Sequence, residues 1–534
     1  MTCMLNIYEL SEKLGISKEF VEPYGNYIGK IDLKALDVKR KKGKLILVTG
    51  MTPTKHGEGK TTTVIGLSQA LAQRGKKVCI SIREPSMGPC FGVKGGATGG
   101  GLSKVEPSDR INLLFTGDFP SVTAAHNLLS AMIHNHIFHG NKLGIDPDQI
   151  LFPMTMDMNE RSLRNIVIND GGKEEGPLIR EHFVITPASE VMSILGLSTS
   201  YEDLVSRLSK ITVAKTFDGK YVYASDLGAQ GAMAAILVDA LKPNLAQTTE
   251  GVPAFIHTGP FGNISHGTSS ILSFRMGLAY ADYLVTEGGF GSDLGFEKYM
   301  NIISRNFGVE VSTVVIVATI RAIKSFDRTE KGDMGEGIGN LLHHIRIVKS
   351  FGLEPVVSLN RFEDDTQEDV QNLITTLREN GFNIAESEVF SKGGPGGLKL
   401  ADLVLEHLDD NHGARSYTYN LEDSIKEKIE KIGKSIYEVD KVIFSRNSLA
   451  HIEEIQKMPN SNLPICISKS QYSFHGNKPN SSDNNLKIND VKVNSGSGLI
   501  IAYSGDIMTM PGLPEIPAAC NINIDKFGVI SNLV

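Results

Sequence analysis

The chain has 534 residues, of which 41% are hydrophobic and 22% charged, enough apolar side chains for several packed cores, which excludes a wholly disordered chain. Lysine and arginine number 54 against 61 aspartates and glutamates, giving a formal net charge of −7 that argues against broad, nonspecific binding of nucleic acid. The 5 cysteines form no Cys-x-x-Cys pair and favour a reducing compartment over a disulfide framework.

Targeting and membrane segments are not expected. The first residues lack the basic and apolar stretches of a secretory signal. The longest apolar runs, 231–238 and 313–320, are too short to span a bilayer. We therefore expect a cytoplasmic protein that binds neither a membrane nor nucleic acid.

Short apolar runs alternate with amphipathic stretches along most of the chain. The first forty residues predict a helical lead-in. Strands are predicted at 45–48, 78–82, 283–286, 313–318, 355–359 and 384–390, and helices at 61–74, 336–350, 368–380 and 424–437. Residues 473–490 are polar and predict a surface loop, whereas 491–503 predict strands. This alternation is typical of an α/β protein with a mostly parallel sheet.

The character of the sequence changes near residue 400, and three units are predicted. We expect a P-loop-type nucleotide-binding domain at residues 1–352, in which helices flank the mostly parallel sheet. A second α/β domain at 353–465 and a small C-terminal domain at 466–534 would complete the chain.

Residues 52–62 predict a phosphate-binding loop between the strand at 45–48 and the helix that follows. They fit the pattern G-x-x-x-x-G-K-[ST], except that Thr54 stands at the first glycine position. Lys60 would bind the β- and γ-phosphates, and the Thr61 hydroxyl would bind Mg²⁺. The ATP-binding residues expected here are Thr54, Lys55, His56, Gly57, Glu58, Gly59, Lys60 and Thr61.

Two further loops are candidates for anion binding. Arg83 and Glu84 directly follow the strand at 78–82, so they would lie beside the phosphate loop at the same sheet edge. Arg83 would neutralise a transferring phosphoryl group, or else form a surface ion pair with Glu84. Residues 92–101 hold six glycines around Lys94, which favours an anion-binding or closing loop over a linker.

Together these segments resemble the formate–tetrahydrofolate ligase family. The resemblance continues through FTGD at 115–118, PFGNISHG at 260–267, TEGGFGSDLG at 286–295, VATIRA at 317–322, KGG at 392–394 and MTMPGLP at 508–514. It covers essentially the whole chain in order. The length resembles the monofunctional form, without a fused dehydrogenase and cyclohydrolase.

The resemblance implies a reaction in which formate, Mg-ATP and tetrahydrofolate give 10-formyltetrahydrofolate, ADP and phosphate. Formyl phosphate would form first, and N10 of the folate would then attack its formyl carbon. Lys60 and Arg83 would supply positive charge, and Glu84 and Asp118 are the acidic catalytic candidates. The candidates for the formate loop are Lys94, Gly95 and Gly96.

The resemblance also implies residues for folate, and the sequence pattern offers candidates for a metal. Phe362 and Phe390, expected at strand ends in the second α/β domain, match family positions that sandwich the pterin. Glu287 and Asp293 lie in a glycine-rich loop after a strand and, with Thr61, are the candidate Mg²⁺ ligands. A monovalent cation and a homotetramer are implied by the family alone.

Two other functions remain open from the sequence. Another P-loop ligase, resembling dethiobiotin synthetase, would share the Gly-Lys-Thr loop but not the ordered matches. A catalytically impaired nucleotide-binding paralogue would keep the fold without turnover, and the chain after Lys324 is shorter than is usual in the family. Family members also commonly have Ala and Tyr at the positions of Thr98 and Leu102, and many have Trp in place of Phe390.

Overall fold

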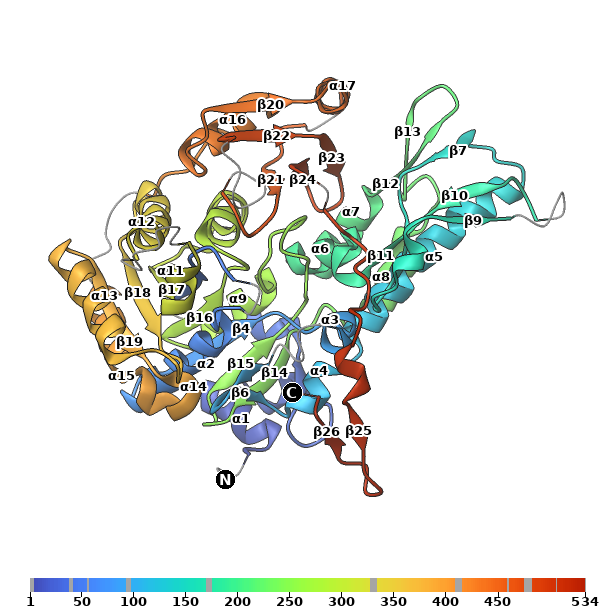
Figure 1. Cartoon of the computed structure of the whole chain (residues 1–534). Coiled ribbons are helices and arrows are strands. Elements are labelled where there is room, and N and C mark those ends of the chain that lie inside the picture. Colours follow the sequence, from blue (N-terminus) through green and yellow to red (C-terminus); the bar gives the residue numbers. More distant parts are fainter. Residues whose placement is uncertain are drawn as a thin grey trace.

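A large sheet forms the centre of the molecule. The structure, a computed structural model, describes residues 4–37, 42–54, 57–92, 98–169, 175–326, 334–408, 415–458, 461–474, 483–505 and 507–533. In this part of the chain a 12-stranded sheet has the main order β1-β2-β14-β15-β4-β16-β3-β17-β18-β19 (Figure 1). These strands are β1 (Val21–Pro23), β2 (Gly29–Ile31), β14 (Asn244–Thr248), β15 (Pro253–Ile256), β4 (Val78–Ile82), β16 (Tyr283–Glu287), β3 (Lys44–Gly50), β17 (Thr313–Ala318), β18 (Pro355–Asn360) and β19 (Asn383–Ser387). All pairs from β15 to β19 are parallel, and the short hairpin of β5 (Gly99–Gly100) and β6 (Ser103–Glu106) joins at β14.

Helices cover both faces of the parallel strands, so successive side chains enter two different cores. In β3, Leu45 and Leu47 belong to one core and Ile46 and Val48 to the other. The first core is covered by α1 (Ile7–Leu14), α9 (Ile271–Tyr280), α12 (Gly335–Ser350) and α13 (Gln367–Glu379), and the second by α2 (Lys60–Gln73) and α15 (Leu398–Leu408). Burial on both faces explains why these strands are continuous apolar runs rather than alternating ones.

The predicted fold class is confirmed: the chain is a mixed α/β protein with a large, mostly parallel sheet flanked by helices. The runs predicted as strands at 45–48, 78–82, 283–286 and 313–318 correspond to β3, β4, β16 and β17. The helix predicted at 61–74 is α2, and Gly75 follows it with φ +73°, a left-handed conformation that suits glycine.

Three element predictions are corrected by the structure. The first forty residues hold β1 and β2 as well as α1, because these two segments pair with each other and β2 pairs with β14. The strand predicted at 384–390 ends at Ser387, and Phe390 lies in the short helix α14 (Val389–Lys392). The polar segment 473–490 contains β22 (Asn485–Ile488), which pairs with β20 (Lys441–Phe444); residues 475–482 lie outside the described residues.

The sheet continues across the domain boundary expected after residue 352. β18 and β19 pair in register beside β17, so they extend the sheet that contains β3. An arm with its own core leaves this body after the N-terminal end of α5 (Asp118–Phe138) and is seen at the right of Figure 1. Its remaining elements include β7 (Ile145–Ile150), β9 (Ile166–Ile168), β10 (Ile179–Glu181), β12 (Thr212–Thr216), β13 (Tyr221–Tyr223) and α8 (Gln230–Ile236).

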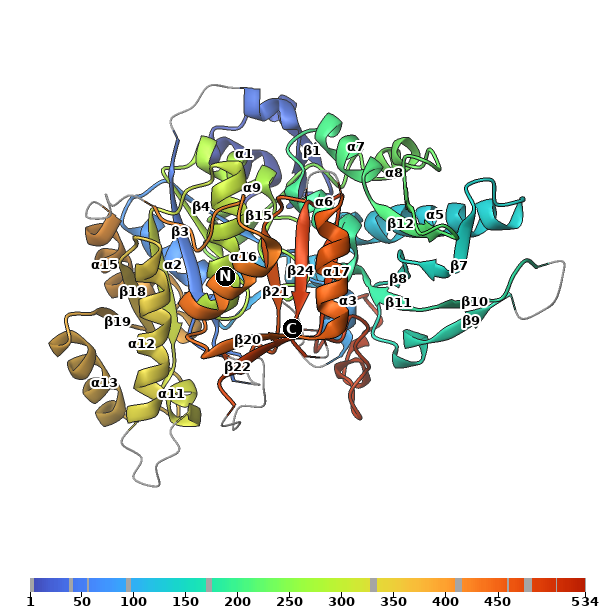
Figure 2. The same ribbon diagram turned by 90° about the horizontal axis from the view of Figure 1, so that it is seen from above.

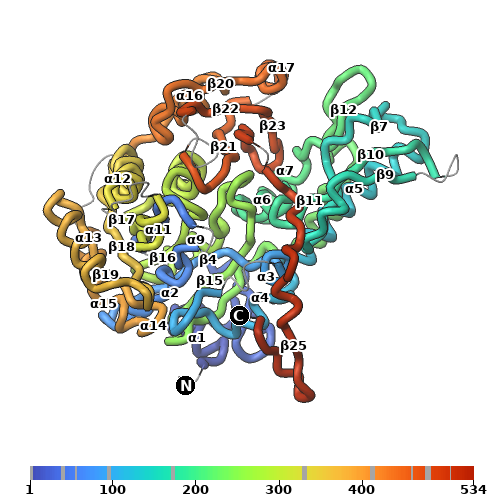
Figure 3. The backbone as a smooth tube through the Cα atoms, viewed as in Figure 1, coloured from blue at the N-terminus to red at the C-terminus, as the bar shows by residue number. Residues whose placement is uncertain are grey.

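The C-terminal elements lie over the middle of the molecule. Figure 2 shows α16 (Ile425–Ser435), α17 (Arg446–Gln456), β21 (Ile465–Ser468) and β24 (Leu499–Tyr503) between the β19 side and the arm. The chain after β24 then descends past the arm toward β25 (Asn523–Ile524), as the tube in Figure 3 shows. Within the described residues, no helix combines the length and the apolar character needed to cross a bilayer.

Candidate active site

The predicted phosphate loop (residues 52–62) joins the central strand β3 to the N-terminus of α2, at the carboxyl edge of the parallel strands. Gly57 and Gly59 both have φ +76°, a backbone conformation that favours glycine. Glu58 is buried; its Oε1 accepts from the Thr54 amide at 2.7 Å and its Oε2 from Thr319 Oγ1 at 2.6 Å. Glu58 therefore shapes the loop from inside. Lys55 and His56 lie outside the described residues.

Neighbouring strands hold the same loop through residues that the sequence analysis did not single out. Asn360, at the end of β18, donates from Nδ2 to the Glu58 carbonyl at 3.0 Å. Arg321, just after β17, donates from Nη2 to the Gly57 carbonyl at 2.6 Å. Asn360 ends β18 and Arg321 lies just after β17, two parallel strands on the same side of β3, so their place at the carboxyl edge of the sheet was a signal that could have identified them.

Three of the predicted residues meet beside this loop. Thr61 Oγ1 donates to Glu287 Oε2 at 2.7 Å, and Arg83 Nη2 lies 3.6 Å from Glu287 Oε1. They come from α2, the end of β16 and the residue after β4. A hydroxyl and a carboxylate oxygen are hard donors of the kind Mg²⁺ prefers, so Thr61 and Glu287 fit a magnesium ion.

Asp293, the third residue expected at the metal, has a different partner. Its Oδ2 accepts from Lys469 Nζ at 2.6 Å, and both side chains are buried. Burial alone would raise the pKa of Asp293, but the charge and hydrogen bond of Lys469, together with His344 and His343, outweigh burial, and the pKa is lowered. The carboxylate therefore neutralises a buried ammonium instead of lying with Thr61. In the described part of the chain, no three His, Cys, Asp or Glu side chains form a metal-binding group.

Glycines lie against the two predicted catalytic cations. A Cβ atom at Gly50 would lie 3.5 Å from Cδ of Lys60, and one at Gly289 would lie 3.5 Å from both terminal nitrogens of Arg83. Nε of Arg83 is buried and has no hydrogen-bond partner among the described residues. A buried guanidinium donor without an acceptor is suited to an anionic ligand.

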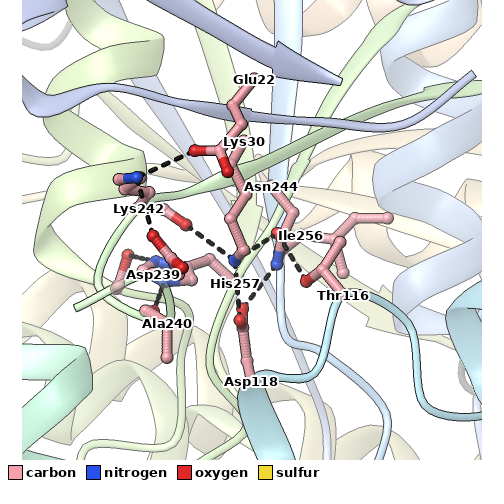
Figure 4. Close-up of polar contacts among 11 residues, drawn as sticks. Glu22, Lys30, Thr116, Asp118, Asp239, Ala240, Lys242, Asn244, Ile256 and His257 are labelled. Carbon is pink, nitrogen blue, oxygen red and sulfur yellow. Dashed lines mark hydrogen bonds and ion pairs between the residues drawn. The ribbon is translucent and has the colours of Figure 1, made fainter. Parts of the chain in front are cut away.

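Glu84 and Asp118, the acidic catalytic candidates, belong to a buried polar cluster. Lys30 Nζ donates to Asp118 Oδ1 at 2.7 Å and to Asn244 Oδ1 at 2.8 Å, and Asn244 Nδ2 donates to Asp118 Oδ2 at 2.7 Å (Figure 4). Burial, followed by the nearby charge of Asp118, raises the pKa of Glu84 well above its ordinary value. Asp118 is thus charge-paired with Lys30, and the neighbouring Glu84 favours its protonated form.

The two predicted folate residues follow adjacent strands, β18 and β19, at the same sheet edge. The Arg321 guanidinium lies 4.6 Å from the ring centroid of Phe362. The Phe390 side chain is 56% exposed, and its ring lies against Gly100, where a Cβ atom would be 2.9 Å away. The rings of Phe362 and Phe390 therefore lie at the carboxyl edge of the sheet that also carries the predicted phosphate loop.

The glycine-rich segment is joined to the Phe390 helix by its own backbone. The Leu102 amide donates to the Phe390 carbonyl at 2.8 Å, and a Cβ atom at Gly101 would lie only 1.9 Å from that oxygen. The candidate formate-loop residues Lys94, Gly95 and Gly96 lie outside the described residues.

Comparison with known proteins assigns the family. A family model described as formate–tetrahydrofolate ligase matches residues 1–534. Curated proteins named formate–tetrahydrofolate ligase are similar over nearly the full chain. The protein of Thermoplasma volcanium is 52% identical over 99% of this chain and 100% of its own length. The Picrophilus torridus protein is 49% identical, covering 98% and 99%, and the Staphylococcus carnosus protein is 46% identical, covering 98% and 96%. This chain therefore belongs to the formate–tetrahydrofolate ligase family.

Proposed function

We propose that this chain ligates formate to N10 of tetrahydrofolate at the expense of ATP, giving 10-formyltetrahydrofolate, ADP and phosphate. Formate needs activation because its carboxylate repels nucleophiles. In the proposed first step, a formate oxygen attacks the γ-phosphorus of ATP and ADP leaves, which forms formyl phosphate. The observation that carries this proposal is the buried Nε of Arg83, which has no partner among the described residues and lies next to Glu287 and the predicted phosphate loop.

Phosphoryl transfer depends on positioning and positive charge. Lys60, at the first position of α2, would bind the β- and γ-phosphates, and Arg83 would contact the transferred group from β4. Thr61 and Glu287 would hold Mg²⁺, which neutralises charge on the phosphates when it is bound. Thr54, Gly57 and the other predicted loop residues would surround the phosphates.

In the second step, N10 of the folate attacks the formyl carbon, the bond from that carbon to the phosphate oxygen breaks, and the N10 proton passes to the departing phosphate. Negative charge develops first on the formyl oxygen and then on the departing phosphate, and Arg83 would stabilise both. Glu84 and Asp118 would be the acidic catalytic groups, held in the buried cluster with Lys30. Since Lys30 pairs with Asp118 and the pKa of Glu84 is raised, the cluster adds little negative charge next to the substrate anions.

Phe362 and Phe390 would hold the pterin between them, and the segment with Lys94, Gly95 and Gly96 would close over formate. Stacking on an aromatic ring contributes about 0.5–1.5 kcal/mol beyond the burial of apolar surface. The monovalent cation, the homotetramer and the P-loop-type domain at residues 1–352 stay predictions. A role in folate binding for the second unit, 353–465, rests on the same two phenylalanines.

The test is ADP release by the purified protein with Mg-ATP, with formate or tetrahydrofolate omitted in turn. We expect release to require both, and the folate product to convert to the methenyl form in acid. ADP release that does not depend on formate or tetrahydrofolate would point to another P-loop enzyme. Tight ATP binding without release would point to an impaired paralogue. Either result would contradict the proposal.

Replacing Phe390 by alanine is expected to raise KM for tetrahydrofolate roughly 2- to 10-fold, because one stacking surface is lost. KM for ATP should stay unchanged, since Phe390 follows β19, whereas the predicted phosphate loop follows β3. Steady-state kinetics with each substrate varied would check this. Phe217→Ala is the matched control, because Phe217 is 71% exposed on the arm; equal effects of the two changes would contradict the assignment.

A further inference from the structure

His344, a buried residue of α12, connects two loops of the candidate site. Its Nε2 lies 3.0 Å from Oγ1 of Thr52, which begins the predicted phosphate loop. Its Nδ1 lies 2.7 Å from Oγ of Ser292. Ser292 opens the π-helical turn η5 (Ser292–Phe296) in the loop that follows Glu287 and β16. One imidazole ring thus contacts the predicted phosphate loop through Nε2 and the loop after Glu287 through Nδ1.

The hydrogen bonds around the ring are consistent with one tautomer. Asn340 Nδ2 donates to Thr52 Oγ1 at 3.0 Å, which leaves the Thr52 hydroxyl proton to be donated to Nε2. Ser292 Oγ lies 3.3 Å from the His344 carbonyl and donates to it, so Ser292 accepts from Nδ1. Burial lowers the pKa of His344 to about 3, so the ring is neutral and both accepts and donates.

The η5 turn, which Ser292 opens, is itself held in place. Next to Ser292, Asp293 pairs with Lys469 at 2.6 Å, and Lys469 Nζ also donates to the Ser473 carbonyl at 2.7 Å. Lys469 directly follows β21, so the C-terminal part of the chain holds the η5 turn. A turn held in this way can act as a support for the loop on the other side of His344.

We propose that His344 is a positioning residue that sets the phosphate loop against the loop of Glu287, so that Thr61 and Glu287 meet where Mg-ATP binds. The inference rests on the proposed function for its substrate. His344 contacts Thr52 and Ser292 rather than the site that ATP would occupy, so its effect passes through these loops.

The test compares variants by the KM for ATP, the KM for tetrahydrofolate and kcat. His344→Ala is expected to raise KM for ATP about 10-fold, the usual effect of losing hydrogen bonds to buried polar partners. KM for tetrahydrofolate should not change. The control is His343→Ala, the preceding residue of α12, whose ring bonds to the Ile436 carbonyl at 2.8 Å and lies 3.3 Å from Glu438. It should leave KM for ATP unchanged.

Conservative replacements separate positioning from packing. The amide of glutamine reaches as far as Nε2 and can accept from Thr52, whereas that of asparagine reaches only the Nδ1 position. His344→Gln should therefore recover most of the affinity for ATP, and His344→Asn should not. Thr52→Val, which keeps the shape and removes Oγ1, should match His344→Ala, and the two changes together should cost no more than either alone.

Some results would overturn the inference. These are an unchanged KM for ATP in a folded His344→Ala protein, equal recovery by Gln and Asn, or additive effects of the two changes. If the alanine variant does not fold, the comparison of His344→Gln with His344→Asn decides. Binding of a non-hydrolysable ATP analogue to each variant, measured by calorimetry, gives the same comparison without turnover, and wild-type turnover tests the proposed function separately.

Discussion

Replacing Lys60 by alanine is expected to reduce formate-dependent ADP formation by about 10³-fold. Lys60 is the first residue of α2, where its ammonium would join the helix N-terminus in binding the β- and γ-phosphates. Removing one preorganised stabiliser of developing charge typically costs about 10²–10³ in rate, and a cation on the transferred group stands at the upper end. A coupled ADP assay at saturating formate and folate measures the loss.

The matched control for this change is Lys76→Ala. Lys76 is an exposed lysine just beyond the other end of α2, so it shares the element but not the site. The control should retain wild-type turnover. Full turnover by the Lys60→Ala protein would mean that the phosphate-loop assignment is wrong.

Replacing Lys30 by alanine is expected to lower the free energy of unfolding by about 3–5 kcal/mol, because a buried carboxylate would lose its countercharge. The side chains of Lys30 and Asp118 are 0% and 2% exposed, and the partners that would remain for Asp118, Asn244 and the neighbouring Glu84, carry no positive charge. Urea denaturation measures the loss. Lys34→Ala, an exposed lysine in the same N-terminal segment, should leave the stability unchanged.

A second variant shows whether the charge is the cause. In the double variant Lys30→Met with Asp118→Asn, neither partner carries a charge, so most of the lost stability should return. No recovery in the double variant would show that packing of the Lys30 stem, rather than charge pairing with Asp118, accounts for the effect.

Local patterns were enough to predict the central elements. The strands β3, β4 and β17 direct apolar side chains to both faces of the sheet, because helices cover both faces. Such apolar runs are visible in a single sequence. The position of Phe390 was harder to predict, because the apolar pair Val389 and Phe390 comes only one residue after the end of β19 at Ser387. The chain turns there instead, and Val389 packs so tightly on α2 that a Cβ atom at Gly66 would lie 2.2 Å from it.

The partners of the site residues could not be predicted, because they are distant in sequence. Lys30 and Asp118 are 88 residues apart, and Asp293 and Lys469 are 176 apart. Without knowledge of Lys469, the glycine-rich surroundings of Asp293 indicate a metal ligand. The pairing becomes visible only in the folded chain, where Lys469, directly after β21, contacts Asp293 in the η5 turn.

The most direct test of this account is the fate of formate oxygen during turnover. The proposed route joins a formate oxygen to the γ-phosphorus and later breaks the bond between that oxygen and the formyl carbon. With formate labelled by ¹⁸O, mass spectrometry of the released phosphate should therefore find one ¹⁸O atom per molecule. Phosphate that carries no label from formate would contradict activation through formyl phosphate, and with it the roles given to Lys60 and Arg83.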